Sequence, residues 1–214
     1  MMKAYFGHWW SIFVEAKVPV TVILMTWGEL GTGNLTNSQP EFVKSVRKQE
    51  FEQAMLKLGF FYHSLGFADL GLSFVNLEVI STNILEVIRL QNLAAVFSFA
   101  PDEYSWGFDH PDHTVSGQAT RVAAASADVA NFHPEIEVVS ERPELYWRVT
   151  DKKRATHALG LSKKSRQRRD RYLEANYPSQ FTKDSQQNWS GIFDRINQTK
   201  KRKSKQKEYY LRIR

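Results

Sequence analysis

The sequence contains no cysteine, and this absence excludes two kinds of protein at the start. A disulfide-stapled scaffold and a thiolate metal site both need cysteine, so any bound metal must be held by histidine, aspartate or glutamate. Long apolar runs are missing too, since no stretch approaches the roughly 20 residues that cross a bilayer. We therefore expect no membrane span.

The first residues also lack the features of a secretory signal. Met1–Tyr5 has no charged segment leading into a long apolar core and a small-residue cleavage site. We expect a cytoplasmic protein by default. With 214 residues, 42% of them hydrophobic, the chain can bury one sizeable core.

Acidic charge is scarce only in the last third of the chain. Residues 1–150 contain 10 basic and 17 acidic residues, whereas residues 151–214 contain 19 and 6, which gives the net charge of +6. This contrast predicts an acidic domain over residues 1–150 and a basic C-terminal extension over residues 151–214. Such asymmetry can accompany binding to nucleic acid or anionic membranes, but it is more often that of a solvated, partly disordered extension.

Strand-like and helix-like patterns alternate along the first 150 residues. Val18–Thr26 is a β-branched run that is apolar on both faces, which is typical of a strand covered by helices. Pro40–Leu58 has helical spacing, starts at a proline and stops before a glycine. The alternation predicts an α/β domain with a mainly parallel sheet. The remaining predicted elements are helices Trp9–Ala16, Leu77–Leu90 and Thr114–Val129, and strands Phe60–Gly66, Ala94–Ala100 and Pro143–Val149.

Two imidazoles and a carboxylate are gathered in the motif His110-Pro111-Asp112-His113. The motif follows a predicted strand and the aromatic and acidic loop 102–109, at the strand edge where open sheets bind ligands. Neutral imidazole and carboxylate suit Zn²⁺. The spacing alone is only moderately specific, because a loop with His-x-x-His can also be structural.

The order of several motifs resembles one family over roughly residues 7–150. Thr26-Trp27-Gly28-Glu29-Leu30-Gly31, then Arg47 and Glu50 on a helix, then Leu65-Gly66-Phe67-Ala68-Asp69, and finally the histidine motif occur in this order. The series is similar to that of the PIG-L/LmbE-type N-acetylglucosaminyl deacetylases. The resemblance implies a Rossmann-like, three-layer α/β fold. It also implies a zinc-dependent hydrolase that removes an acetyl or acyl group from an N-acylated amino sugar or related small molecule.

The resemblance also implies roles for the histidine motif. His113 matches the metal ligand, and His110 matches the residue that polarises the substrate carbonyl and stabilises the oxyanion. Asp112 would orient the cluster.

Three further residues match positions that line the substrate pocket in the family: Glu29, Arg47 and Asp69. Without the family resemblance, each of the three could have a role unrelated to substrate binding. Glu29 could be a solvated loop carboxylate, Arg47 a helix-face partner of Glu50, and Asp69 a turn residue.

One part of the family pattern is absent. The family has a first cluster of the form Ala/Pro-His-Pro-Asp-Asp-Glu, which follows its first strand and supplies the other zinc ligands and the general base. Ungapped alignment puts Met1 at or just beyond the last aspartate of that cluster, so we expect the first strand to be missing too. A catalytic zinc needs about three protein ligands, and His113 alone cannot hold it. The chain as written is therefore expected to be inactive.

The basic extension supports an alternative function. Lys163–Arg171 and Lys200–Lys205 are basic runs with Tyr172, Tyr177 and other aromatic residues nearby, a combination that can bind phosphate backbones and stack bases. The chain could thus be a non-catalytic binding or scaffold relative whose tail contacts nucleic acid or another anionic partner. No nucleic-acid motif accompanies the runs, and the same charges could attract an anionic substrate. Nothing in the sequence indicates an oligomeric state.

Overall fold

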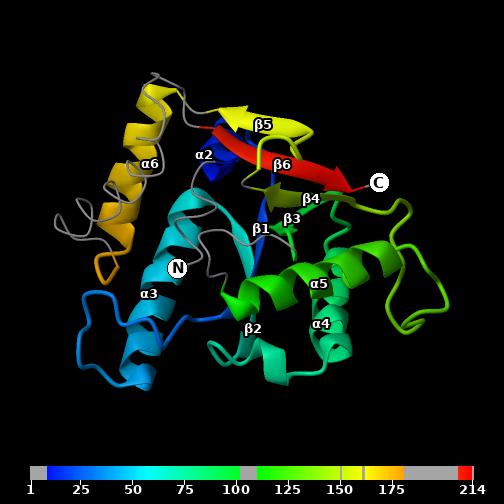
Figure 1. Cartoon of the computed structure of the whole chain (residues 1–214), viewed down its shortest axis with the longest axis horizontal. Helices are drawn as coiled ribbons and strands as arrows, with labels where there is room; N and C mark the ends of the chain where they lie inside the picture. The colour runs from blue at the N-terminus through cyan, green and yellow to red at the C-terminus, as the bar shows by residue number, and fades with distance from the viewer. Residues whose placement is uncertain (1–8, 102–109, 150, 161, 181–206, 214) are drawn as a thin grey trace. The chain divides into compact units, whose positions relative to one another are not determined.

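A computed structural model of the chain describes residues 9–101, 110–149, 151–160, 162–180 and 207–213 (Figure 1). Among these residues, no helix has the length and apolar character that crossing a bilayer requires. The elements, in chain order, are α2 (Trp9–Ala16), β1 (Thr21–Thr26), α3 (Pro40–Leu58), β2 (Phe61–Phe67), the 3-10 helix η1 (Leu72–Phe74), α4 (Leu77–Leu90), β3 (Ala95–Phe99), α5 (Pro111–Ser126), β4 (Glu144–Val149), β5 (His157–Gly160), α6 (Lys163–Asn176) and β6 (Lys207–Ile213).

The described strands form two sheets. One contains β1 and β2, and the other has the order β3-β4-β6-β5. The β3 and β4 strands are parallel, with Ala95 opposite Glu144, whereas β6 runs antiparallel to β4, with Leu145 opposite Ile213. The predicted α/β class with a parallel sheet is confirmed. The structure adds β5 and β6, which the sequence did not reveal, and the missing first strand stays a prediction.

The chain divides into two compact units, each described by itself. Unit 1 contains residues 1–22, 27–62 and 160–207, and unit 2 contains residues 23–26, 63–159 and 208–214. Both units take residues from either side of position 150. The charge pattern predicted a domain over residues 1–150 and an extension over residues 151–214. This division stays a prediction.

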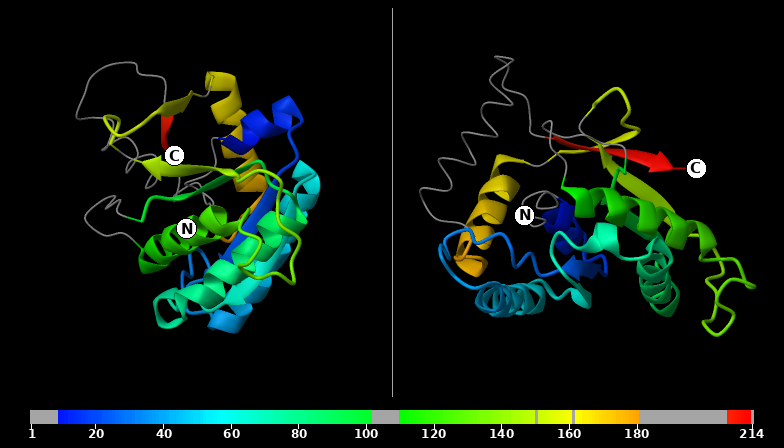
Figure 2. Two further views of the ribbon diagram at one scale, coloured as in Figure 1. Left: turned by 90° about the vertical axis from the view of Figure 1, so that its right-hand side faces the viewer. Right: turned by 60° about the horizontal axis from the view of Figure 1, so that its bottom comes forward.

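The core of unit 2 lies between the β3-β4 sheet and two helices that pack against each other, α4 and α5 (Figures 1 and 2). Ile80, Ile84 and Ile88 recur at helical spacing on α4 and are almost fully buried. After the first turn of α5 the buried positions are small, and Gly117 lies so close to the Phe99 carbonyl that a Cβ would overlap it. These small residues therefore let α5 pack closely on the sheet.

The helix ends follow local chemistry. Pro40 occupies the first turn of α3, and Gly59 ends the helix in the left-handed conformation with φ of 68°. The predicted bounds of α3 and α4 are thus confirmed. The predicted start of the next helix at Thr114 is wrong, because α5 begins at Pro111, whose missing N–H costs nothing in a first turn.

A buried arginine holds the segment that follows α5. All five N–H groups of Arg89, which is 5% exposed, donate to backbone carbonyls 2.8 to 3.1 Å away. Because every donor is used, one α4 side chain holds the backbone of residues 126–136 at and after the end of α5. The five acceptors are the carbonyls of Ser126, Ala127, Val129, His133 and Ile136.

We predict that Arg89→Met lowers the free energy of unfolding by at least about 3 kcal/mol, because it leaves five carbonyls without this donor. Urea denaturation followed by circular dichroism measures the change. The matched control is Arg142→Met, which removes an exposed ion pair with Asp128 and should cost no more than about 1 kcal/mol. Equal effects of the two substitutions would contradict the anchoring role of Arg89.

Candidate functional site

The histidine motif of unit 2 lies at the N-terminal end of α5. His110 is the N-cap residue in extended conformation, and its carbonyl accepts a hydrogen bond of 2.8 Å from the His113 N–H. Asp112 and His113 lie in the first helical turn and are buried. The loop predicted to contribute aromatic and acidic side chains, residues 102–109, lies outside the described residues.

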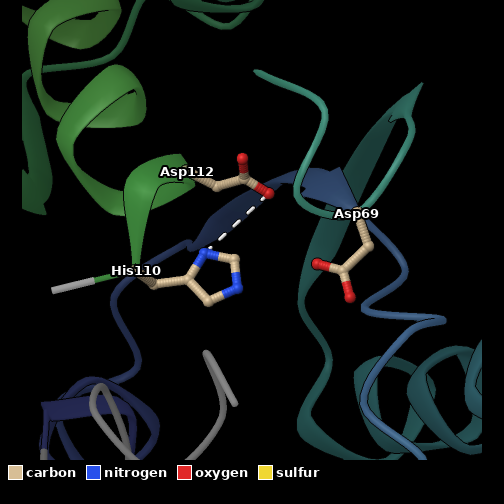
Figure 3. Close-up of side chains that lie close together, drawn as sticks. All are labelled: Asp69, His110 and Asp112. Carbon is tan, nitrogen blue, oxygen red and sulfur yellow. Dashed lines mark ion pairs between the residues drawn. The ribbon is translucent and has the colours of Figure 1, made fainter. Parts of the chain in front are cut away.

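Asp69, His110 and Asp112 come together from two segments of unit 2 (Figure 3). One ligand atom from each of the three lies within 4.8 Å of the others. His110 Nδ1 is 3.9 Å from Asp112 Oδ2, a distance that makes an ion pair when the imidazole is protonated. Asp69 follows β2, and its Oδ1 is 3.5 Å from Thr26 Oγ1 at the end of β1. The sequence predicted all three residues, and the structure places them side by side.

The Asp112 carboxylate binds the segment after Asp69. Its Oδ2 accepts the Leu70 N–H at 2.8 Å, and its Oδ1 accepts the Leu72 N–H at 3.2 Å. Leu70 has a φ of 61°, a left-handed conformation that is uncommon for a leucine. Because both carboxylate oxygens are engaged, Asp112 fixes the backbone beside Asp69 in this strained conformation.

Burial raises the pKa of the Asp112 carboxyl above its usual range. The hydrogen bonds from Leu70 and Leu72 and the nearby His110 oppose that shift, and the Asp69 carboxylate adds to it. The net direction shows that desolvation outweighs the two N–H donors.

His113 is held by an aromatic contact. Its ring stacks on Phe99 at the end of β3, with centroids 3.9 Å apart and planes 9° apart. The His110 ring is 5.2 Å away. Among the described residues, the group with metal-ligand geometry contains His110 and not His113. One imidazole and two carboxylates form a donor set that suits zinc.

Glu29 and Arg47 belong to unit 1, where Arg47 holds the loop that carries Glu29. The buried Arg47 guanidinium donates to the carbonyls of Gly28 and Gly31, on either side of that residue. Glu50, one turn along α3, instead accepts from Ser179. The contribution of Ser179 was missed by sequence reasoning, because no local pattern connects positions 129 residues apart.

Solved structures with the same fold were found for almost the whole chain. A Pyrococcus horikoshii N,N'-diacetylchitobiose deacetylase has a TM-score of 0.79 at 17% identity, covering 98% of this chain and 78% of its own. The A40926 pseudoaglycone deacetylase Dbv21 has a TM-score of 0.62 at 15% identity, covering 97% and 91%. The 4-carboxy-2-hydroxymuconate hydratase GalB from Pseudomonas putida has a TM-score of 0.67 at 16% identity, covering 98% and 90%. The fold is therefore the Rossmann-like α/β fold of these deacetylases, and a hydratase shares it.

The sequence settles the family within that fold. Residues 5–124, more than half of the chain, match the PIG-L family, described as GlcNAc-PI de-N-acetylase. The chain belongs to this family, so the predicted resemblance is confirmed. A similar curated protein is the Bacillus cereus "Probable N-acetyl-alpha-D-glucosaminyl L-malate deacetylase 2", which is 28% identical over 132 residues, 60% of this chain. The chain matches 58% of that relative's length.

We predict that Asp112→Asn lowers the free energy of unfolding by about 1–3 kcal/mol, because the amide NH₂ cannot accept one of the two backbone N–H groups. Amide exchange should accelerate at Leu70 or Leu72, and hydrogen-exchange mass spectrometry measures it. Asp128→Asn is the matched control on the exposed surface, and it should leave this exchange unchanged. Undisturbed exchange at both leucines in Asp112→Asn would contradict the anchoring role of the carboxylate.

Proposed function

We propose that this protein is of the zinc-dependent N-deacetylase type, which removes an acetyl or acyl group from an N-acylated amino sugar or a related small molecule. We further propose that residues 1–214 alone, without the family's first cluster, are inactive. The observation that carries the proposal is the family membership over residues 5–124, joined to the histidine and carboxylate side chains gathered at the start of α5. The Bacillus and Pyrococcus relatives are both named as deacetylases of N-acetylated sugars, which supports the substrate class. A cytoplasmic location remains a prediction.

The proposed zinc ligand in the described part of the chain is His113, as the family resemblance implies. The His113 ring stacks on Phe99 and lies beside the ring of His110. A metal held by His113 would therefore lie near a substrate carbonyl bound by His110. Within the described residues, the group with ligand atoms close together is instead Asp69, His110 and Asp112. Bound zinc would supply a Lewis acid that activates water and polarises the amide carbonyl.

His110 is proposed to stabilise the developing oxyanion. It caps the N-terminal end of α5, where the helix dipole also favours negative charge. Asp112 acts as a positioning residue, since it holds the strained Leu70 backbone and lies beside the His110 ring. Asp69 and Glu29 are proposed to accept hydrogen bonds from sugar hydroxyl groups.

The basic extension has a second proposed role, in contacting an anionic partner such as nucleic acid. The α6 helix carries exposed Arg168 and Arg171, although Arg168 also lies 3.8 Å from Glu15. The other basic run, Lys200–Lys205, lies outside the described residues. Binding of this kind would weaken steeply with salt, which separates it from deacetylation.

The test uses a chain extended before Met1 by the family's first strand and cluster, here called the extended chain. Deacetylation predicts that the extended chain releases equal amounts of acetate and primary amine from an N-acetylglucosaminyl substrate in the presence of Zn²⁺, whereas residues 1–214 alone release neither. His110→Ala should slow this release at least about 100-fold, as loss of an oxyanion donor does. Acetate by coupled assay and amine by fluorescamine measure the two products. His133→Ala, a histidine of unit 2 bonded to Thr82 and Glu135, is the control and should stay within about twofold. Absence of acetate from every N-acetylated sugar tried with the extended chain would refute the proposed reaction.

Zinc affinity tests which side chains hold the metal. In the extended chain, we expect His113→Ala to weaken Zn²⁺ binding at least about tenfold, and Asp69→Asn to change it less than about twofold, because only the first is a proposed ligand. Competition with a chromogenic chelator measures both affinities. The reverse pattern would assign the metal to the group of Asp69, His110 and Asp112 instead.

A further inference from the structure

Two charged side chains of α3 are buried in unit 1 and reach different loops. Arg47 is 5% exposed and Glu50 is 8% exposed, and their spacing of three residues places them on one face of the helix. Buried charges persist where hydrogen bonds satisfy them. The partners of these two therefore indicate which segments α3 holds.

Arg47 holds residues 28–34, here called the Glu29 loop. Its two terminal nitrogens donate to the carbonyls of Gly28 and Gly31. Gly28 has a φ of 70°, and a Cβ there would lie 2.5 Å from Arg47 Nη1, so only glycine allows this close approach. The guanidinium is thus engaged with the loop backbone that surrounds Glu29.

Glu50 holds Ser179, which lies in the turn after α6. Its Oε1 accepts the Ser179 N–H at 2.7 Å, and its Oε2 accepts the Ser179 hydroxyl at 2.6 Å. Ser179 is itself buried, at 6% exposed. Hydrogen bonds to a charged acceptor in such surroundings are among the stronger ones.

Ser179 in turn contacts the Glu29 loop directly. Its carbonyl accepts the Asn34 N–H at 2.8 Å, and the Asn34 side chain donates to the Pro178 carbonyl at 2.8 Å. Gly33 has a φ of 58°, and a Cβ there would lie 2.6 Å from the Ser179 oxygen. One end of the loop therefore rests on Arg47 and the other on the segment that Glu50 holds.

The segment that includes Ser179 is itself anchored on α3. The Tyr172 hydroxyl donates to the Ala54 carbonyl at 2.6 Å, and Lys57 Nζ donates to Asn176 Oδ1 at 2.6 Å. Tyr177 is buried at 3% exposed, and burial raises its pKa well above the usual range. Residues 172–180 are thus fixed at several points before they reach the loop.

We propose that residues 172–180 are a positioning element for the Glu29 loop, with Ser179 and Glu50 as its positioning residues. Arg47 also acts through this loop, by holding the backbone on both sides of Glu29. The C-terminal region then helps to set substrate affinity without supplying a reacting group. The part of this inference that concerns affinity rests on the proposed function, in which Glu29 contacts the substrate.

The position of the loop can be tested without any activity, by hydrogen-exchange mass spectrometry on the full chain. Ser179→Ala and Glu50→Gln should each accelerate exchange in peptides covering residues 28–35 at least about tenfold, and leave those of α4 unchanged. Ser45→Ala is the matched control, since its exposed hydroxyl bonds only the Phe42 carbonyl of the same helix. Unchanged exchange in the 28–35 peptides of both variants would overturn the proposal.

Asn34→Ala provides a second variant in case loss of the buried serine unfolds the protein. Its exposed side chain makes the bond to Pro178, so the fold should survive and exchange in the 28–35 peptides should still rise at least about threefold. Rates equal to the wild type would overturn the proposal in that case.

Kinetics separate positioning from mere stability. In the extended chain, at a temperature where both variants are folded, Ser179→Ala should raise KM for the N-acetylated sugar at least about fivefold and change kcat less than about twofold. A fall in kcat at constant KM would overturn the role in affinity. If the extended chain releases no acetate without the Ser179 substitution, the proposed function fails, while the exchange measurements still decide whether the element positions the loop.

Discussion

The hydrogen bonds from Leu70 and Leu72 to the buried Asp112 carboxylate are the constraint on which the candidate site depends. They join the first turn of α5 to the segment that follows β2. They also hold Leu70 in a left-handed conformation that a leucine rarely adopts without support. The arrangement of Asp69, His110 and Asp112 thus depends on one buried carboxylate, which accepts hydrogen bonds from two backbone N–H groups.

The sequence predicted the parts of the fold that depend on neighbouring residues. The bounds of α3 and α4 could be predicted because Pro40, Gly59 and the apolar spacing act within a few residues. The start of α5 was misplaced because Pro111 was taken as part of the loop, although proline suits a first helical turn. The β6 strand could not be predicted, since its pairing with β4 joins residues more than 55 positions apart.

For the candidate site, too, the sequence predicted some of the residues and missed the contacts that depend on folding. Motif order identified Asp69, His110 and Asp112, and the structure brings them together. The backbone donors of Leu70 and Leu72 could not be predicted, because any residue supplies an N–H and only the turn geometry aims it. The same limit applies to Ser179, whose contact with Glu50 appears only once the chain has folded back on α3. A hydratase and two deacetylases share this fold, so the fold alone does not assign a reaction. The side chains at the site must assign it.

The antiparallel pairing of β6 with β4 has a consequence for how the chain can vary. Phe97 of β3 stacks on Tyr146 of β4 with centroids 4.9 Å apart, and its ring meets the edge of the buried Tyr210 from β6. Residues far beyond position 150 therefore complete an aromatic cluster on the sheet that contains β3 and β4. The C-terminal region cannot be exchanged between relatives as an independent module, because β3 and β4 would have to change with it.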